Sequence, residues 1–192
     1  DLHLAAAGLL SRKIGGPSVY PPMPKDIAEL SYAGNFKWQT SPGEDRYRRG
    51  LYTFFKRTAP HPELMTFDCP DANLTNVRRT VSNTPLQALT TLNAESFVEA
   101  ASALAGRVLA EPGLKEDAAR LERAFRICLS RRPQARELES LEALLKEARY
   151  HYQNAPVEEV KAMAGGEASI ERAALAATTR IILNTDEFIT RG

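Results

Sequence analysis

Apolar residues in the second half of the chain recur with the period of an α-helix. Between residues 84 and 192 they return every three or four positions, so that they share one face of a helix. No segment alternates apolar and polar residues with a period of two, and no internal repeat is visible. The pattern predicts an all-α fold, a helical bundle with buried stripes at Phe97, Ala100, Leu104 and Val108; at Leu121, Phe125 and Cys128; at Leu138, Leu141 and Leu145; and at Ile170, Ala174, Ala177 and Ile181.

Capping residues mark the start of this bundle. Thr84 precedes Pro85, a residue favoured at the first helical position, and Gln87 can return a hydrogen bond to the backbone of the cap. We expect a helix from Pro85 to about Asn93, a second helix directly after it, and a third over about residues 115–130.

The first third is rich in proline and aromatic residues and is expected to be largely irregular. Residues 2–13 are typical of the last turns of a helix, which Gly15 and Gly16 would end. The prolines that follow cannot continue a helix, because they lack the amide donor and favour an extended residue before them. Apolar residues at helical spacing predict a second helix over 45–57, and residues 58–83 form a long connection of the kind that is often functional or interdomain.

Length and composition narrow the class of protein. The 192 residues hold 25 Lys plus Arg against 24 Asp plus Glu, and 43% of them are hydrophobic, as in soluble globular proteins. The net charge of +1 gives no overall attraction to nucleic acid or to an anionic membrane, and no apolar run is long enough to span a bilayer. We expect a single domain over 1–192, with an irregular part and two helices in 1–83 and the bundle in 84–192. Because the chain begins with Asp1 inside an expected helix, it is predicted to be an excised or processed piece of a longer polypeptide.

Recognisable catalytic or metal-binding motifs are absent from the sequence. Loops that bind nucleotides, hydrolase elbows and zinc-protease motifs are missing, and the three histidines lie singly, so we expect no metal site and no cofactor in this fragment. Cys69 and Cys128 lie outside any metal- or haem-binding spacing, and the sequence leaves their pairing open. Asp68 and Asp71 beside Cys69 fit a turn, and the acids at 186–187 fit a terminal cap, as well as they fit catalysis.

One strongly basic neighbourhood covers residues 46–57, which contain no acid. Its guanidinium groups could hold sulfate, phosphate or carboxylate, and its aromatic faces could carry sugars. In the alternative interpretation the aromatic side chains enter the core and the arginines pair with acids such as Glu44, Asp45 and Asp68.

A second basic pair, Arg78-Arg79, precedes the capped helix and either adds to that surface or is simply solvated. The candidate ligand-binding residues are Arg46, Arg48, Arg49, Tyr52, Lys56, Arg57, Arg78 and Arg79.

Four sequence blocks together resemble a known family. They read SRKIGGPSVYPP at 11–22, YRRGLYTFFKRT at 47–58, NTPLQAL at 83–89 and LNTDEF at 183–188. In this order and spacing they resemble the carboxyl-terminal portion of the planctomycete-type domain of unknown function 1553. The chain departs from the family at Phe55, where Trp is common, and at Gly50, where Ser is usual.

The resemblance implies a large exported bacterial protein with a further domain of unknown function and a cytochrome c-like domain upstream. It therefore implies a location outside the cytoplasm, and it supplies no catalytic residues. Three hypotheses follow: an accessory helical module that packs against upstream domains, a module that binds or processes sulfated or uronic polysaccharide, and a docking partner of the cytochrome c-like domain. Whether the chain is an enzyme is left open.

Overall fold

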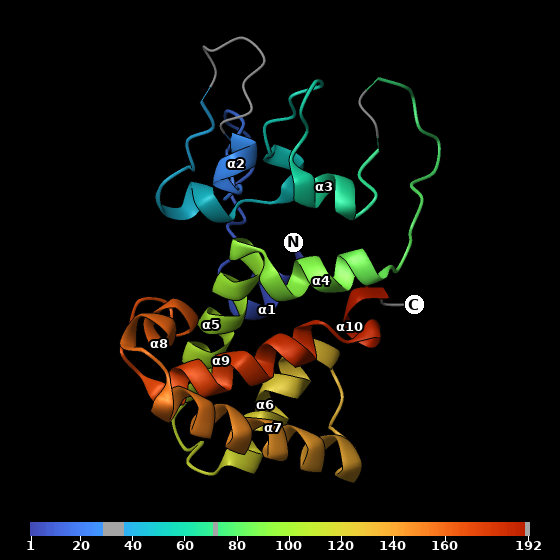
Figure 1. Ribbon diagram of the computed structural model, residues 1–192. Helices are drawn as coiled ribbons and strands as arrows, with labels where there is room; N and C mark the ends of the chain where they lie inside the picture. Colours follow the sequence, from blue (N-terminus) through green and yellow to red (C-terminus); the bar gives the residue numbers. More distant parts are fainter. Residues whose placement is uncertain (29–36, 71–72, 191–192) are drawn as a thin grey trace. The chain divides into compact units, whose positions relative to one another are not determined.

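The computed structural model describes residues 1–28, 37–70 and 73–190, and over these residues the protein is all-α, without a β-strand (Figure 1). The chain forms two compact units. The first unit contains Asp1 and residues 10–96, and the second contains residues 2–9 and 97–192. The predicted change of character at residue 84 thus falls inside the first unit, and the single-domain organisation stays a prediction.

The first unit consists of short helices joined by long irregular segments. Its helices are α2 (Lys25–Ala28), α3 (Pro62–Thr66) and α4 (Pro85–Asn93), with 3-10 turns at Gly43–Tyr47 and Gly50–Tyr52. The predicted cap of α4 is confirmed: Gln87 N donates to Thr84 Oγ1 over 3.3 Å, and Thr84 N donates to Gln87 Oε1 over 3.0 Å. The sequence pattern does not indicate α3, which lies within the expected long connection.

The predicted helix over 45–57 is wrong. This segment forms the two 3-10 turns, and Arg48 and Thr53 between and after them have extended backbones that bridge in parallel to Ser11 and Val19. The amides of Ser11 and Val19 donate to carbonyls of the segment over 2.9 and 2.8 Å. These long-range bonds outweigh the local apolar spacing, because the segment satisfies its backbone with a neighbouring segment and not with itself.

The first helix, α1 (Leu2–Ala7), belongs to the second unit and is shorter than expected. It ends at Gly8, whose φ of +78° is the left-handed conformation that glycine tolerates. Gly8 N donates to Ala5 O over 3.1 Å and Leu9 N donates to Leu4 O over 2.9 Å, the paired bonds of a Schellman motif. Gly8, and not Gly15 or Gly16, is therefore the residue that ends this helix.

The second unit is the predicted bundle. Its further helices are α5 (Glu95–Leu109, of which the first two residues lie in the first unit), α6 (Asp117–Leu129), α7 (Ala135–Asn154), α8 (Val157–Met163), α9 (Ile170–Leu183) and α10 (Asp186–Thr190). Helices α7 and α9 lie side by side over most of their length (Figure 1). The predicted stripes of α5, α6 and α7 are confirmed by their buried members, among them Leu104, Leu121 and Leu145.

The predicted stripe of α9 is correct only in part. Ala174 is buried, but Ile170 and Ile181 are 39% and 41% exposed. The helix instead buries a broader alanine-rich face that ends in Ile182 and Leu183. Small side chains let neighbouring helices approach on more than one side, so a single stripe does not describe this helix.

Phe188 shows what the last of the four sequence blocks does. Its ring is fully buried at α10, and the ring of His3 meets it edge to face with centroids 4.9 Å apart. His3 Nε2 lies 3.1 Å from Leu183 O, so the block holds α1 against the end of α9. The block is explained by packing within the second unit.

Replacing Phe188 with Ala is expected to lower the free energy of unfolding by about 3–5 kcal/mol, because it removes a buried ring and leaves a cavity. Phe188→Leu, which keeps most of the volume, should cost about 1.5 kcal/mol or less. Thermal and urea unfolding followed by far-UV circular dichroism measure both. Equal stability of Phe188→Ala and the wild type would contradict this role.

Candidate functional site

The predicted basic and aromatic residues of segment 46–57 lie in the first unit, where this segment runs beside residues 11–19. Three backbone bonds join the two segments: Ser11 N to Tyr47 O, Val19 N to Tyr52 O, and Phe54 N to Val19 O, at 2.8–2.9 Å. The first two sequence blocks, 11–22 and 47–58, therefore pair with each other through their backbones. Arg48 of the second block contacts the first block through its side chain.

The side chain of Arg48 is buried, with 4% of the residue exposed. Its Nη2 donates to the carbonyl oxygens of Lys13 and Gly15 over 3.0 and 2.7 Å, and its Nη1 donates to Pro17 O over 3.4 Å. The guanidinium carbon lies 3.7 Å from the centre of the Tyr52 ring, a close cation–π contact, and the Tyr52 hydroxyl accepts from Gly15 N over 3.0 Å. Arg48 and Tyr52 thus hold the 13–17 loop, and both Nη atoms of Arg48 are occupied, whereas its buried Nε has no hydrogen-bond partner among the described residues.

The remaining arginines of the segment each have a separate partner. Arg46 Nη2 pairs with Glu95 over 2.7 Å, Arg49 Nε lies 3.6 Å from an Asp1 carboxylate oxygen, and Arg57 Nε donates to Asn73 Oδ1 over 3.0 Å. Glu44 and Asp45 instead face Lys13, at 3.9 and 3.7 Å. The expectation that arginines pair with acids holds for Arg46 and Arg49, although with other acids than those named from the sequence.

The other candidates differ in exposure. Lys56 is half-buried, whereas Arg57, Arg78 and Arg79 are exposed. Arg79 donates to the main-chain oxygens of Phe67 and Asp68. The side chain of Arg78 makes no hydrogen bond or ion pair with the described residues, and only its backbone amide is bonded, to Asn76. Among the described residues, the contacts of Arg48, Arg57 and Arg79 go to separate partners and do not bring these side chains together around one ligand position.

A cluster of aromatic side chains with two polar anchors lies in the first unit. Trp38 packs against Tyr20, Phe54 and His61, with ring centroids 5.1–6.5 Å apart. Trp38 Nε1 donates to Pro21 O over 2.7 Å, and His61 Nε2 donates to Pro22 O over 2.9 Å. Burial lowers the pKa of His61 and the bond to Pro22 opposes this, so the ring is held neutral. The prolines of the first block serve as acceptors for this cluster.

Asp68 and Gln87 form a third polar centre, which the sequence analysis missed. The Asp68 carboxylate accepts from Ser82 N and Ser82 Oγ over 2.8 and 2.7 Å and from Gln87 Nε2 over 3.3 Å. The bonds from Ser82 are the main reason that the pKa of Asp68 is lowered. Gln87 also donates to Thr66 O over 2.9 Å. The capping motif at 84–87 is the one sequence signal here, and it gives no hint that the same amide binds Asp68; Asp71 lies outside the described residues.

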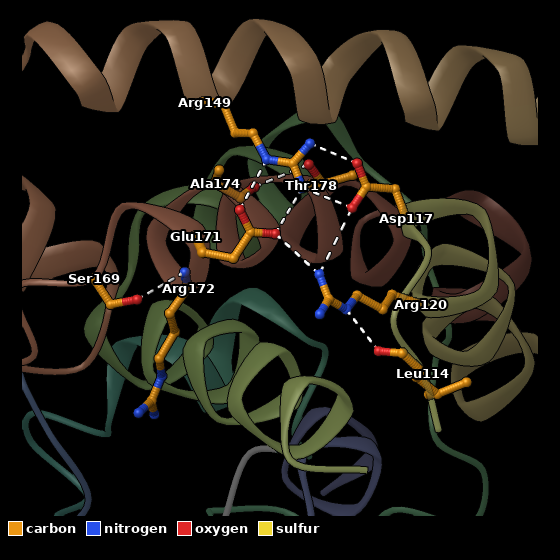
Figure 2. A network of polar contacts seen from close by, with 9 residues as sticks. All are labelled: Leu114, Asp117, Arg120, Arg149, Ser169, Glu171, Arg172, Ala174 and Thr178. Carbon is orange, nitrogen blue, oxygen red and sulfur yellow. Dashed lines mark hydrogen bonds and ion pairs between the residues drawn. The ribbon is translucent and has the colours of Figure 1, made fainter. Parts of the chain in front are cut away.

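The second unit contains a network of four charged side chains (Figure 2). Arg149 donates both Nη atoms to Asp117 over 2.6 and 2.7 Å, and Nε and Nη2 to Glu171 over 2.9 and 2.6 Å. Arg120 Nη1 lies 3.3 Å from Glu171 and 3.7 Å from Asp117. The bonds from Arg149 lower the pKa of Asp117. Two cations and two anions balance here, so the network joins α6, α7 and α9 and leaves no charge for a ligand.

The described part of the chain has few features of other kinds of site. No group of three or more His, Cys, Asp or Glu side chains there could hold a metal ion. No helix there is long and apolar enough to cross a membrane. Neither Cys69 nor Cys128 forms a disulfide in the structure.

Comparison with known proteins identifies the family. The family model PSD1, described as a protein of unknown function (DUF1553), matches residues 1–145, which is more than half of the chain. The chain therefore belongs to this family, as its sequence blocks indicate; three of the four blocks lie in the matched region and the fourth, at 183–188, lies beyond it. No curated protein and no solved structure matches the chain.

Replacing Arg48 with Met is expected to lower the free energy of unfolding of the first unit by about 2–4 kcal/mol, because three main-chain acceptors lose a charged donor and Tyr52 loses its stacked partner. The fluorescence of Trp38, the one tryptophan of the sequence, during urea unfolding reports this directly.

Arg49, the next residue in the sequence, supplies the matched control, because its own side chain is exposed and lies 3.6 Å from its partner Asp1. Arg49→Met should change the stability by about 0.5 kcal/mol or less. Equal effects of the two substitutions would show that the burial of Arg48 does not stabilise the first unit.

Proposed function

We propose that this chain is an accessory module that binds a preceding domain of the same polypeptide through an apolar face of its first unit. The observation that carries the proposal is the inverted polarity of α4. The helix buries Gln87 and Thr91, two polar residues, and exposes Leu86 and Leu89, which are 61% and 58% exposed. A helix normally buries its apolar side, so an exposed apolar side indicates a surface made for a partner.

The loop before α4 also exposes large apolar side chains. Leu74, Val77 and Val81 are all more than three-quarters exposed. We refer to these three residues together with Leu86 and Leu89 as the exposed apolar residues of 74–89. Each large apolar side chain that a partner covers contributes on the order of 1.5–3 kcal/mol, which offsets part of the cost of association.

The choice of partner rests on the family resemblance, which implies large proteins with further domains upstream. Arg78 lies in the sequence among the exposed apolar residues of 74–89, and its side chain has no bond to the described residues. The expected partner surface is therefore apolar with an acidic edge. If the neighbour is the cytochrome c-like domain that the resemblance implies, this contact is where it docks, and the module works outside the cytoplasm.

The contacts of the basic segment favour this proposal over a catalytic one. Arg48, Tyr52 and Arg46 are engaged in bonds that hold the first unit together. Their substitution would therefore change stability first, whereas Leu86 and Leu89 can be changed without loss of internal packing.

The double variant Leu86→Asp/Leu89→Asp tests the proposal. The isolated chain is expected to keep its unfolding temperature, because both side chains are exposed. Its affinity for the purified remainder of the polypeptide, measured by isothermal titration calorimetry, should fall at least about tenfold, because two charges enter an apolar contact.

Val157→Asp is the matched control, since Val157 is 52% exposed on α8 of the second unit. It should leave the affinity unchanged. If the wild-type chain does not bind the remainder of the polypeptide, or if the double variant binds equally well, the proposal fails.

A second candidate function is the binding of anionic polysaccharide, which the unbonded Arg78 and the exposed Arg57 favour. Binding to dextran sulfate should then weaken steeply with salt and drop about tenfold in Arg57→Glu/Arg78→Glu. Lys161→Glu, which changes an exposed charge on α8, is the control. Retained binding in the double variant would exclude these residues as the site.

A further inference from the structure

A shallow groove of about 370 Å³ runs along the outer side of α7 and α9, entirely within the second unit. Its apolar lining comes from both helices: Leu144, Ala148 and Tyr152 from α7, and Ala177 and Ile181 from α9. Leu144 is 37% exposed and Ile181 is 41% exposed, and the lining also contains two alanines. The groove therefore offers an apolar floor that a neighbouring ridge of side chains can approach closely.

The arginine on the α9 wall differs from the other half-buried arginines of the second unit. Those others each pair with an acid, within 3.3 Å; they are Arg120, Arg123, Arg131, Arg149 and Arg172. Arg180 is also half-buried, yet it makes no hydrogen bond or ion pair with any residue that the structure describes. It lies near Tyr152, whose pKa burial raises and Arg180 lowers.

The opposite wall, formed by α7, carries a carboxylate that likewise has no hydrogen bond or ion pair with the described residues. This carboxylate belongs to Glu147, which lines the groove. The other polar lining residues are already used: His151 lies 2.7 Å from Glu159, and Thr178 donates to Ala174 O over 3.0 Å. One cation and one anion thus stand on the two walls of one apolar groove, and they do not pair with each other.

We propose that this groove is the interface of a homodimer, in which Arg180 of each copy pairs with Glu147 of the other. A two-fold axis brings the same patch of both copies together, so residue i meets residue j and residue j meets residue i. Such a patch must be complementary to itself. A surface with one unpaired charge of each sign beside exposed Leu144 and Ile181 meets that condition, whereas a partner with a single sign of charge would satisfy only one wall. The inference uses residues of the second unit alone and does not rest on the proposed function.

Charge exchange in the full 192-residue chain tests the pairing. Sedimentation equilibrium should show a dimer for the wild type, and Arg180→Glu or Glu147→Arg alone should raise the dimer dissociation constant about tenfold or more, since each change places like charges together at two symmetric positions. The double variant Arg180→Glu/Glu147→Arg restores opposite charges and should bring the constant back close to that of the wild type.

Matched controls come from the far side of α7, where Glu139 and Lys146 are exposed and do not line the groove. Glu139→Arg and Lys146→Glu should leave the dissociation constant unchanged, and circular dichroism should show that every variant is folded. The proposal would be overturned by a wild type that stays monomeric up to high concentration. It would also be overturned if neither single substitution changed the dimer dissociation constant, or if the double variant did not restore the wild-type constant.

Discussion

Polar groups inside the first unit need hydrogen-bond partners, and over its described residues this unit has neither long helices of its own nor a sheet to supply backbone bonds. In this unit, side chains act as the hydrogen-bond partners instead. Arg48 donates hydrogen bonds to three carbonyl oxygens of the 13–17 loop. Trp38 and His61 donate to the carbonyl oxygens of two successive prolines, and Gln87 donates to that of Thr66 while it also caps α4. Polar and aromatic residues that look like ligand-binding chemistry in the sequence are therefore what allows an irregular segment to pack.

The second unit meets the same requirement in the ordinary way. Its longer helices satisfy their own backbones, so their side chains are free to pack, and buried alanines keep the helix axes close together. Charged side chains then join helices from outside the core, as Arg149 does with Asp117 and Glu171 (Figure 2). The balance of charge in that network explains why a group of four ionised residues marks structure and not a site.

This difference decides how far the sequence could predict the structure. Periodicity predicts α5, α6 and α7 because their burial is set by local spacing, and the Thr84 cap is readable because both of its bonds are local. The same spacing misleads at 45–57, where the backbone pairs with residues more than 30 positions away. No local pattern states that Arg48 turns inward while Arg49 turns outward. The inverted polarity of α4 is likewise hidden, since Gln87 is buried by bonds to Thr66 and Asp68 that only the fold creates.

The three bonds of Arg48 span 31 to 35 residues, which has a consequence for the order of events during synthesis. As the chain leaves the ribosome, residues 13–17 have no local partner for their carbonyl groups and must stay hydrated until Arg48 has emerged behind them. Closing a loop of this length costs entropy before any contact rewards it, so this part of the chain is expected to order late. The α7 helix needs no such delay, because its backbone bonds join neighbours four residues apart.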